Sequence, residues 1–320
     1  MATYKGIRGH TIRTVAGDIS PVALGDIWYS NTARKIRVGK TTAGAWASGG
    51  AVPVEMNSQA VGGIQTAAIS ASGTTPGGDT VNVQQYDGST WTEIANVNTG
   101  RNGIRGTGTT AAFVAWGGSS PPEGTLTEEF NGTSWTEVSG SLNTVRYATA
   151  ATGTATAALA TGGNAHDPMS DANESYDGST WSELADLNTA RQSPASSGIT
   201  TAAICFGGGN PGYVDASETW DNSSWTEGNT LNTARGYMMG TGTSVPGALA
   251  FGGRLPAGAA VTEQYDGSSW TEVADLSTAR GDGGGAGTQT LALCVSGQPP
   301  ATTAVEEWTI AASVETVAFD

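Results

Sequence analysis

The segment YDGSTWTE, Tyr86–Glu93, recurs in five close copies along a chain of 320 residues. The other copies begin at Phe130, Tyr176, Trp220 and Tyr265, so the segment returns about every 45 residues. The Asp-Gly and Asn-Gly dipeptides within it accept the positive φ angles that a tight hairpin turn requires. An aromatic residue on each side of such a turn predicts two short antiparallel strands joined at their tip.

Three landmarks repeat together with this segment, and each occurs six times. The tryptophan after the turn recurs as Trp46, Trp91, Trp135, Trp181, Trp225 and Trp270. The aromatic residue before the turn recurs as Tyr86, Phe130, Tyr176, Trp220, Tyr265 and Trp308. A glycine recurs as Gly73, Gly118, Gly163, Gly208, Gly253 and Gly297. A repeat near 45 residues that holds four short strands is typical of a β-propeller, so the sequence predicts an all-β protein with six blades.

One repeat divides into four expected strands. Residues 103–109 (GIRGTGT) are rich in glycine, and residues 111–118 (AAFVAWGG) are apolar. Residues 126–130 and 134–138 carry the two aromatic landmarks. Because neighbouring blades crowd together near the axis, the small residues of the first strand predict the innermost position. The bulky aromatic residues suit the outer strands, where the gap between blades widens.

The repeat array is incomplete at both ends. Trp46 has no preceding strands of its own, and Trp308 has no repeat-like strand after it. We therefore expect the strand around Trp46 to complete the blade that contains Trp308, which leaves no free inner edge. The alternative, which we rank second, is that residues 312–319 supply the missing strand.

The composition agrees with an all-β protein. The chain contains 47 glycines, with 38% hydrophobic and 13% charged residues. No segment resembles a transmembrane helix or the apolar core of a signal peptide, so we expect synthesis in the cytoplasm without a signal peptide. Cys205 and Cys294 occupy equal positions two repeats apart, and we expect two separate buried thiols.

Charge divides the chain into two parts. Residues 1–40 hold seven basic and two acidic residues, a net +5, whereas the remainder holds seven arginines and 27 acidic residues, a net −20. An acidic body argues against binding to nucleic acid or insertion into anionic membranes. We predict a basic anchoring arm and hairpin over residues 1–40, which contacts other proteins, and a propeller over residues 41–320. The candidate contact residues of the arm are Arg8, Arg13, Trp28, Arg34, Lys35 and Arg37.

Two charged residues also follow the repeat. An arginine ends the linker before five of the repeats, at Arg101, Arg146, Arg191, Arg235 and Arg280. A glutamate lies two residues before the first aromatic landmark, at Glu128, Glu174, Glu218, Glu263 and Glu306. The sixth repeat has Met56 and Gln84 instead, so both charges are lost together, which predicts a structural ion pair. A second possible partner set follows the tryptophans, at Glu93, Glu137, Glu183, Glu227 and Glu272. A ring of arginines that binds an anion is the less favoured hypothesis.

No motif for catalysis or for a cofactor is present. The sequence lacks HExxH, paired CxxC, P-loop and GxSxG motifs. The DGSTW segments resemble part of the Asp box of sialidases, but the full spacing is not met, and only Arg105 and Arg254 break the arginine repeat. Turn formation explains the repeated aspartates, with weak Ca²⁺ binding as the alternative. We expect no enzyme activity, no cofactor and no metal site.

The loops between the second and third strands differ in every repeat. They contain proline, glycine and scattered polar residues, whereas the hairpin turns are uniform. Variation on a rigid scaffold often marks a binding surface, although drift in surface loops explains it equally well. The candidate binding residues of these loops are Pro121, His166, Asp167, Tyr213 and Arg254.

Gly-Gly, an aromatic residue 11 to 13 positions later and a tryptophan five positions further resemble the kelch repeat, over about residues 41–310. The NTAR linker and the leading segment GDIWYSNTARKIRV, residues 25–38, are similar to kelch-like structural proteins of tailed marine bacteriophages. This resemblance implies a six-bladed, non-enzymatic, tail-associated virion protein. Its arm would bind other virion proteins, and its loops would face a host glycan or protein. The alternatives are a carbohydrate- or protein-binding propeller outside a virion and a degenerate glycan hydrolase.

Overall fold

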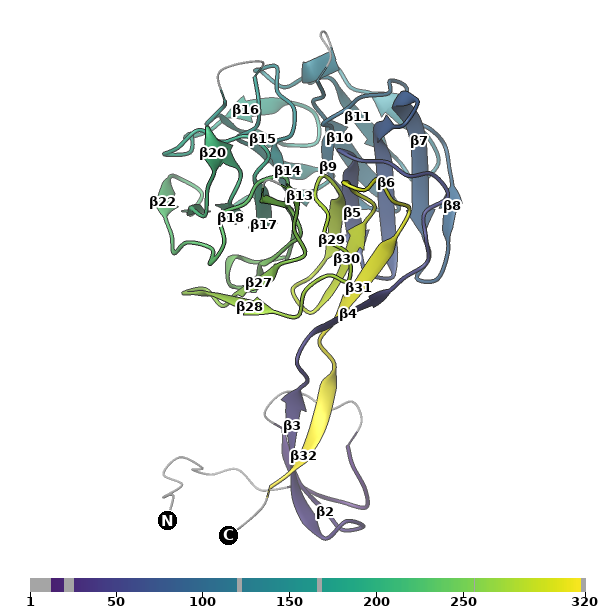
Figure 1. The fold of residues 1–320 in the computed structure, drawn as a ribbon, viewed down its shortest axis with the longest axis vertical. Helices are drawn as coiled ribbons and strands as arrows, with labels where there is room; N and C mark the ends of the chain where they lie inside the picture. Colours follow the sequence, from purple (N-terminus) through teal and green to yellow (C-terminus); the bar gives the residue numbers. More distant parts are fainter. Residues whose placement is uncertain (1–12, 20–25, 120–122, 166–168, 256, 318–320) are drawn as a thin grey trace. The chain divides into compact units, whose positions relative to one another are not determined.

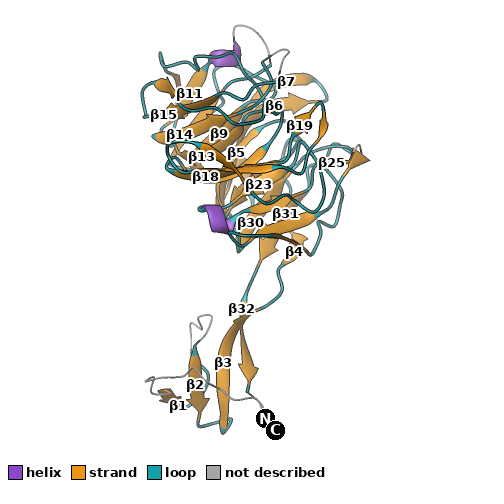
Figure 2. Ribbon diagram, turned by 90° about the vertical axis from the view of Figure 1, so that its left-hand side faces the viewer, coloured by secondary structure: helices purple, strands orange, loops and turns teal. Residues whose placement is uncertain are grey.

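The computed structural model describes residues 13–19, 26–119, 123–165, 169–255 and 257–317. Within these ranges the protein is all-β, with two short 3-10 helices, η1 (Glu123–Thr125) and η2 (Val245–Gly247). Figure 2 shows strands and loops throughout, with the two helices in purple. The chain forms two compact units, Ala45–Thr309, which we call the ring unit, and the two chain ends up to Gly44 and from Ile310, which we call the terminal unit.

The ring unit contains six of the seven four-stranded sheets in the described residues. The first sheet consists of β5 (Ala60–Ile64), β6 (Ala67–Thr75), β7 (Gly78–Tyr86) and β8 (Trp91–Glu93). The second consists of β9 (Arg105–Thr109), β10 (Ala112–Trp116), β11 (Thr127–Phe130) and β12 (Trp135–Glu137). The third consists of β13 (Ala150–Thr154), β14 (Ala157–Thr161), β15 (Asn173–Tyr176) and β16 (Trp181–Glu183).

The remaining sheets of this unit follow the same antiparallel order. The fourth consists of β17 (Ala195–Ile199), β18 (Ala202–Phe206), β21 (Ser217–Trp220) and β22 (Trp225–Glu227). The fifth consists of β23 (Met239–Thr241), β24 (Leu249–Phe251), β27 (Thr262–Tyr265) and β28 (Trp270–Val273). The sixth consists of β29 (Gly284–Gly287), β30 (Leu291–Val295), β31 (Val305–Thr309) and β4 (Ala45–Ser48).

Two short hairpins extend loops of the fourth and fifth sheets. They are β19 (Gly209–Asn210) with β20 (Gly212–Tyr213), and β25 (Arg254–Leu255) with β26 (Ala257–Gly258).

The sixth sheet joins the beginning of the ring unit to its end. Strand β4 pairs with β31 in antiparallel register, with Trp46 opposite Trp308, which is the pairing predicted from these two landmarks. The first strand of each sheet contacts the first strand of the next, in the order β5, β9, β13, β17, β23, β29 and back to β5. Figure 1 labels β5, β9, β13, β17 and β29 around the centre of the ring unit. The sheets therefore form a closed circle.

A circle of backbone hydrogen bonds lies at the start of these innermost strands, and we call it the axial ring. Its six residues have φ angles between 49° and 70°, and the amide of each donates to the carbonyl of the preceding one at 2.7 to 3.2 Å. They are Ser58, Gly103, Ala148, Ser193, Tyr237 and Asp282. Because this left-handed backbone suits glycine best, the axial ring is a place where side chains are held at a conformational cost.

The aromatic landmarks fill the space between neighbouring sheets, as predicted. Tyr176 and Trp181 lie 5.1 Å apart between ring centroids in one hairpin, and Trp181 packs in one cluster with Val114 and Trp116 of the preceding sheet. The Trp181 indole also donates to Thr127 Oγ1 at 2.9 Å. Corresponding aromatic pairs occur at Tyr86–Trp91, Phe130–Trp135, Trp220–Trp225 and Tyr265–Trp270.

Both cysteines are buried and free, as the sequence predicted. Burial raises the pKa of Cys205 to about 12 and that of Cys294 to about 11, which keeps both thiols protonated near neutral pH. They are therefore small core residues.

The terminal unit is a four-stranded sheet of β1 (Arg13–Val15), β2 (Ile27–Ser30), β3 (Lys35–Thr41) and β32 (Ala312–Thr316), in that order. Strands β2 and β3 form the predicted hairpin. Residues 312–316 pair with β3 and do not supply the strand opposite Trp308, so the second-ranked closure is wrong. The division predicted at residue 40 assigned this C-terminal strand to the propeller, whereas it groups with the N-terminal residues.

Candidate functional site

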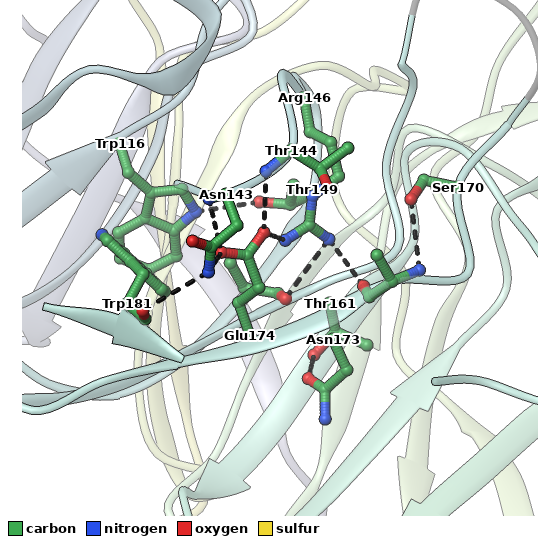
Figure 3. A network of polar contacts seen from close by, with 12 residues as sticks. Trp116, Asn143, Thr144, Arg146, Thr149, Thr161, Ser170, Asn173, Glu174 and Trp181 are labelled. Carbon is green, nitrogen blue, oxygen red and sulfur yellow. Dashed lines mark hydrogen bonds and ion pairs between the residues drawn. The ribbon is translucent and has the colours of Figure 1, made fainter. Parts of the chain in front are cut away.

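The repeated arginines and glutamates form buried ion pairs. Arg146 Nη2 lies 2.6 Å from Glu174 Oε1, and both side chains are almost fully buried. The other carboxylate oxygen accepts hydrogen bonds from the backbone and side-chain amides of Asn143 at 2.8 and 2.9 Å. Arg146 Nη1 also donates to the Ala172 carbonyl at 2.6 Å. Figure 3 shows Arg146, Glu174 and Asn143 with the hydrogen bonds that join them. The same pairing occurs at Arg101–Glu128, Arg191–Glu218, Arg235–Glu263 and Arg280–Glu306.

These contacts decide between the two sets of glutamates that the sequence left open. The glutamates that follow the tryptophans are all exposed, at positions 93, 137, 183, 227 and 272. Each repeated arginine instead ties the linker that enters a sheet to the third strand of that sheet. Since a buried arginine is costly without a partner, the five arginines serve the fold and are not free to bind an anion.

The first sheet shows how the same junction is built without charge. Met56 is buried in place of the arginine. The amide of Gln84 accepts from the backbone N–H of Val54 at 2.9 Å and donates to its carbonyl at 3.0 Å. This explains why both charges are lost together, because the Gln84 amide alone forms the hydrogen bonds to the linker backbone and needs no charged partner.

The repeated aspartates are also used by the fold. Asp87 Oδ1 accepts hydrogen bonds from the backbone amides of Ser89 and Thr90 at 2.9 and 2.8 Å. These hydrogen bonds, that of Thr90 foremost, lower the pKa of Asp87 to about 2. Among the described residues, no group of three or more His, Cys, Asp or Glu side chains is arranged to hold a metal ion.

The candidate site is a cavity of about 590 Å³ in the ring unit, which we call the axial cavity. Five of the six axial-ring residues line it, all except Ser193. The cavity therefore lies at the centre of the circle of sheets, next to the residues that begin the first strands. Its polar and aromatic lining includes Glu55, Asn57, Asn102, Arg105, Tyr147, Tyr237, Arg254, Asp282 and Gln298.

Arg105 occupies a place in the innermost strands where the other sheets have uncharged, mostly small residues. The equivalent positions, four residues after each repeated arginine or Met56, are Ala60, Ala150, Ala195, Met239 and Gly284. Arg105 is half-buried and lines both the axial cavity and a smaller space of about 70 Å³ that residues of the first strands also line. Its Nη1 donates to the neighbouring Ile104 carbonyl at 2.9 Å. Burial lowers the pKa of Arg105, and the charge of Asp282 opposes this effect.

Arg254 and Asp282 form an ion pair in the lining of the same cavity. Asp282 belongs to the axial ring, and burial raises the pKa of its carboxyl while Arg254 and Arg105 lower it. The guanidinium of Arg254 also lies 5.0 Å from the ring centroid of Tyr237, a distance suited to a cation–π contact. The carboxylate of Asp282 is thus committed to Arg254.

The variable loops border this cavity. Arg254 begins the β25–β26 hairpin, Thr74 and Thr75 end β6, and Thr302 lies in the loop between β30 and β31. Tyr213, in the β19–β20 hairpin, packs edge-on against Tyr237 with 6.5 Å between ring centroids. The predicted residues Arg254 and Tyr213 therefore lie at or beside the cavity, whereas Pro121, His166 and Asp167 lie outside the described residues.

The candidate contact residues of the N-terminal arm fall into three groups. Arg34 and Lys35 are exposed at the β2–β3 turn, and Arg37 is half-buried, with its Nη1 donating to Thr316 Oγ1 at 2.8 Å. Trp28 is fully buried and packs inside the terminal unit. It is therefore not available to contact another protein, contrary to the prediction. Arg8 lies outside the described residues, and of Arg13 only the backbone, in β1, is described.

Sequence reasoning missed Asp282, Tyr147 and Tyr237 and did not count Arg105 among the binding residues. A signal for Arg105 was present, because it alone places a charge among the small residues of the first strands. No comparable signal marks the others, since only the closed circle brings residues of four different repeats to one cavity.

Neither of the two short helices in the described ranges has the length and apolarity of a membrane span. No protein-family model matches the chain, and no curated protein sequence matches it. Solved structures do match, among them that of YjhT, with a TM-score of 0.65 and 15% sequence identity. The match covers 83% of this chain and 99% of the YjhT chain. Together with the circle of four-stranded sheets, this likeness shows that the chain is folded as a β-propeller.

Proposed function

We propose that the chain is a non-enzymatic structural protein of a virion tail, a six-bladed kelch-like propeller attached to other virion proteins through its terminal unit. The observation that carries this proposal is that the repeated charged and aromatic side chains are engaged in contacts that stabilise the fold. The arginines, glutamates, aspartates and tryptophans of the repeat hold sheets, linkers and turns together. The repeated residues of this chain therefore stabilise the ring of sheets, as expected for repeat proteins.

The terminal unit supports an attachment role because it is a separate body made from both chain ends. Part of its basic charge is neutralised internally, since Lys40 pairs with Glu315 and Arg37 lies 3.5 Å from Asp18. Arg34 and Lys35 form no ion pair among the described residues and are exposed at the tip of the β2–β3 hairpin. This tip is the part of the unit best suited to an acidic protein partner.

The variable loops around the axial cavity support a second, display role. A host surface glycan or protein is the proposed contact of these loops, while nucleic acid is not, because the chain carries a net charge of −15. The proposed location is the virion tail, without membrane insertion. A propeller that binds carbohydrate or protein outside a virion is the alternative.

Mass spectrometry of purified phage particles tests the assignment. We expect peptides of this chain in particles freed of soluble lysate, and a reduced amount when Arg34→Glu and Lys35→Glu reverse the charge of the hairpin tip. Glu93→Lys, on an exposed glutamate of β8, is the matched control and should leave incorporation unchanged. Absence of the chain from particles would exclude the virion role. Unchanged incorporation of the double variant would exclude attachment through the hairpin tip.

A further inference from the structure

Arg105 differs from the repeated arginines in how its charge is satisfied. Each of the five repeated arginines has a buried glutamate as its partner. Within the described part of the chain, no carboxylate lies within ion-pair distance of Arg105. A guanidinium has five N–H donors, and the described residues accept one hydrogen bond from it, at the Ile104 carbonyl. Arg105 therefore presents unused donors and a positive charge to the cavity.

The other charged groups in the cavity do not replace that partner. Asp282 attracts Arg105 electrostatically, but its carboxylate is paired with Arg254. Glu55 also lines the cavity, and it forms no ion pair among the described residues. The Asp282 carboxylate is thus shared by two guanidiniums, and Glu55 adds a second negative charge to the lining of the cavity.

We propose that the axial cavity binds a small hydroxylated carboxylic acid, whose carboxylate is held by Arg105. A carboxylate accepts two parallel hydrogen bonds from the planar guanidinium fork, which makes arginine the side chain best suited to it. The site lies at the centre of the ring and is independent of attachment through the terminal unit, so it goes beyond the proposed structural role.

The size and lining of the cavity set the rest of the ligand. About 590 Å³ is within the range of small-molecule sites, which is about 300 to 1,000 Å³. Tyr147 and Tyr237 offer aromatic surface, and Asn57, Asn102 and Gln298 add amide groups. Of these, Asn57 Nδ2 already donates to the Thr74 carbonyl and Gln298 Nε2 to Asn57 Oδ1. Such a mixture suits a ligand with several hydroxyl groups on a compact apolar frame.

Tyr237 and Asp282 place larger side chains beside the cavity in a backbone conformation that all six axial-ring residues share. Both residues have φ near +53°, which is unfavourable for a bulky or branched side chain. Gly103 takes the same place in the second sheet without this cost.

Isothermal titration of the full chain with glucuronate and with glucose tests the proposal, because the two probes differ mainly in the carboxylate. We expect glucuronate to bind and glucose to bind at least tenfold more weakly. Arg105→Met is the decisive variant, since Met239 shows that methionine fits the equivalent place in β23. Loss of the charge-assisted contact should weaken glucuronate binding by about tenfold to a hundredfold.

Two further variants distinguish an effect on binding from a loss of folding. Arg105→Lys keeps the charge but loses the planar fork, and should weaken glucuronate binding by several-fold. Glu55→Gln removes a negative charge from the cavity lining and should strengthen glucuronate binding, because glucuronate is an anion. Equal binding of glucose and glucuronate, no binding of glucuronate, or unchanged affinity in folded Arg105→Met would each overturn the proposal.

Discussion

Arg146 and Glu174 show how single residues hold this ring together. Their ion pair is buried, and it is completed by Asn143 and by backbone carbonyls. The value of such a pair depends on both partners, because removing one leaves the other as an uncompensated buried charge. The protein contains its own uncharged version of the junction in Met56 and Gln84.

Replacement of Arg146 by methionine should therefore destabilise the protein by about 3 to 5 kcal/mol, since Glu174 is left without its partner. The double variant Arg146→Met with Glu174→Gln recreates the residues of the first sheet and should recover more than half of that loss. Urea denaturation followed by tryptophan fluorescence measures both free energies of unfolding. A double variant as unstable as the single one would show that the ion pair is not the source of the effect.

The sequence could predict that the repeated arginines form ion pairs, but not which set of glutamates supplies their partners. The joint absence of both charges in the repeat of Met56 and Gln84 indicated an ion pair. Two sets of glutamates remained, because strand period alone does not say which side chain faces the linker. Burial of Glu174 and exposure of Glu183 separate the sets only in the folded sheet.

At the scale of the element, the hairpin tip is the most self-contained part of the fold. Asp177 Oδ1 accepts from the backbone amides of Ser179 and Thr180, each at 2.8 Å, so the turn is closed by its own residues. Asn131 accepts the corresponding hydrogen bonds in the second sheet, at 3.0 and 2.9 Å. Local closure explains why the turn could be predicted from sequence.

The turns should also give the protein a measurable acid dependence. Hydrogen bonds from the turn backbone and the serine hydroxyls lower the pKa of Asp87, Asp177 and Asp266 to about 2. A carboxyl with a lowered pKa in the folded state stabilises the protein above its unfolded pKa, near 4, and this contribution is lost as the pH falls through about 2.

The triple variant Asp87→Asn, Asp177→Asn and Asp266→Asn keeps an acceptor in each turn, as Asn131 does, but does not titrate. Its free energy of unfolding, measured in urea at pH 7, 4 and 2.5, should fall less between pH 4 and 2.5 than that of the unaltered protein. Parallel losses in the two proteins would mean that the turn carboxylates do not contribute.

Less regular elements escaped sequence reasoning. Pro246 lies in η2, between β23 and β24, and these strands have three residues each. The β19–β20 and β25–β26 hairpins arise within loops whose sequences do not repeat. Such features depend on contacts of one loop with its own surroundings, which the repeat cannot predict.

At the scale of the whole molecule, the ends of the chain do two different things. Strand β4 completes the sheet of β31, and β3 pairs with β32 in the terminal unit. The first pairing could be predicted, because Trp46 and Trp308 each lack the neighbour that the repeat requires. The second could not, because residues 312–316 carry no landmark and their partner strand lies outside the repeat.

The axial cavity could not be predicted from the sequence either. Arg105, Arg254 and Asp282 belong to different repeats and meet only because the circle of sheets is closed. A departure from the repeat can be seen in the sequence, but the group that it meets cannot. Arg105 and Arg254, the two arginines that break the repeat, both line the cavity.

The pairing of β4 with β31 closes the ring, and a cross-link between these strands tests the pairing most directly. Ala45 and Thr309 are opposite each other in these strands, and both are exposed. Ala45→Cys with Thr309→Cys should form an intramolecular disulfide on mild oxidation, since directly opposed strand positions have suitable geometry. Peptide mass spectrometry of the monomer should show residues 45 and 309 linked, with Cys205 and Cys294 remaining as free thiols. A monomer without this link, or disulfides only between molecules, would contradict the closed ring.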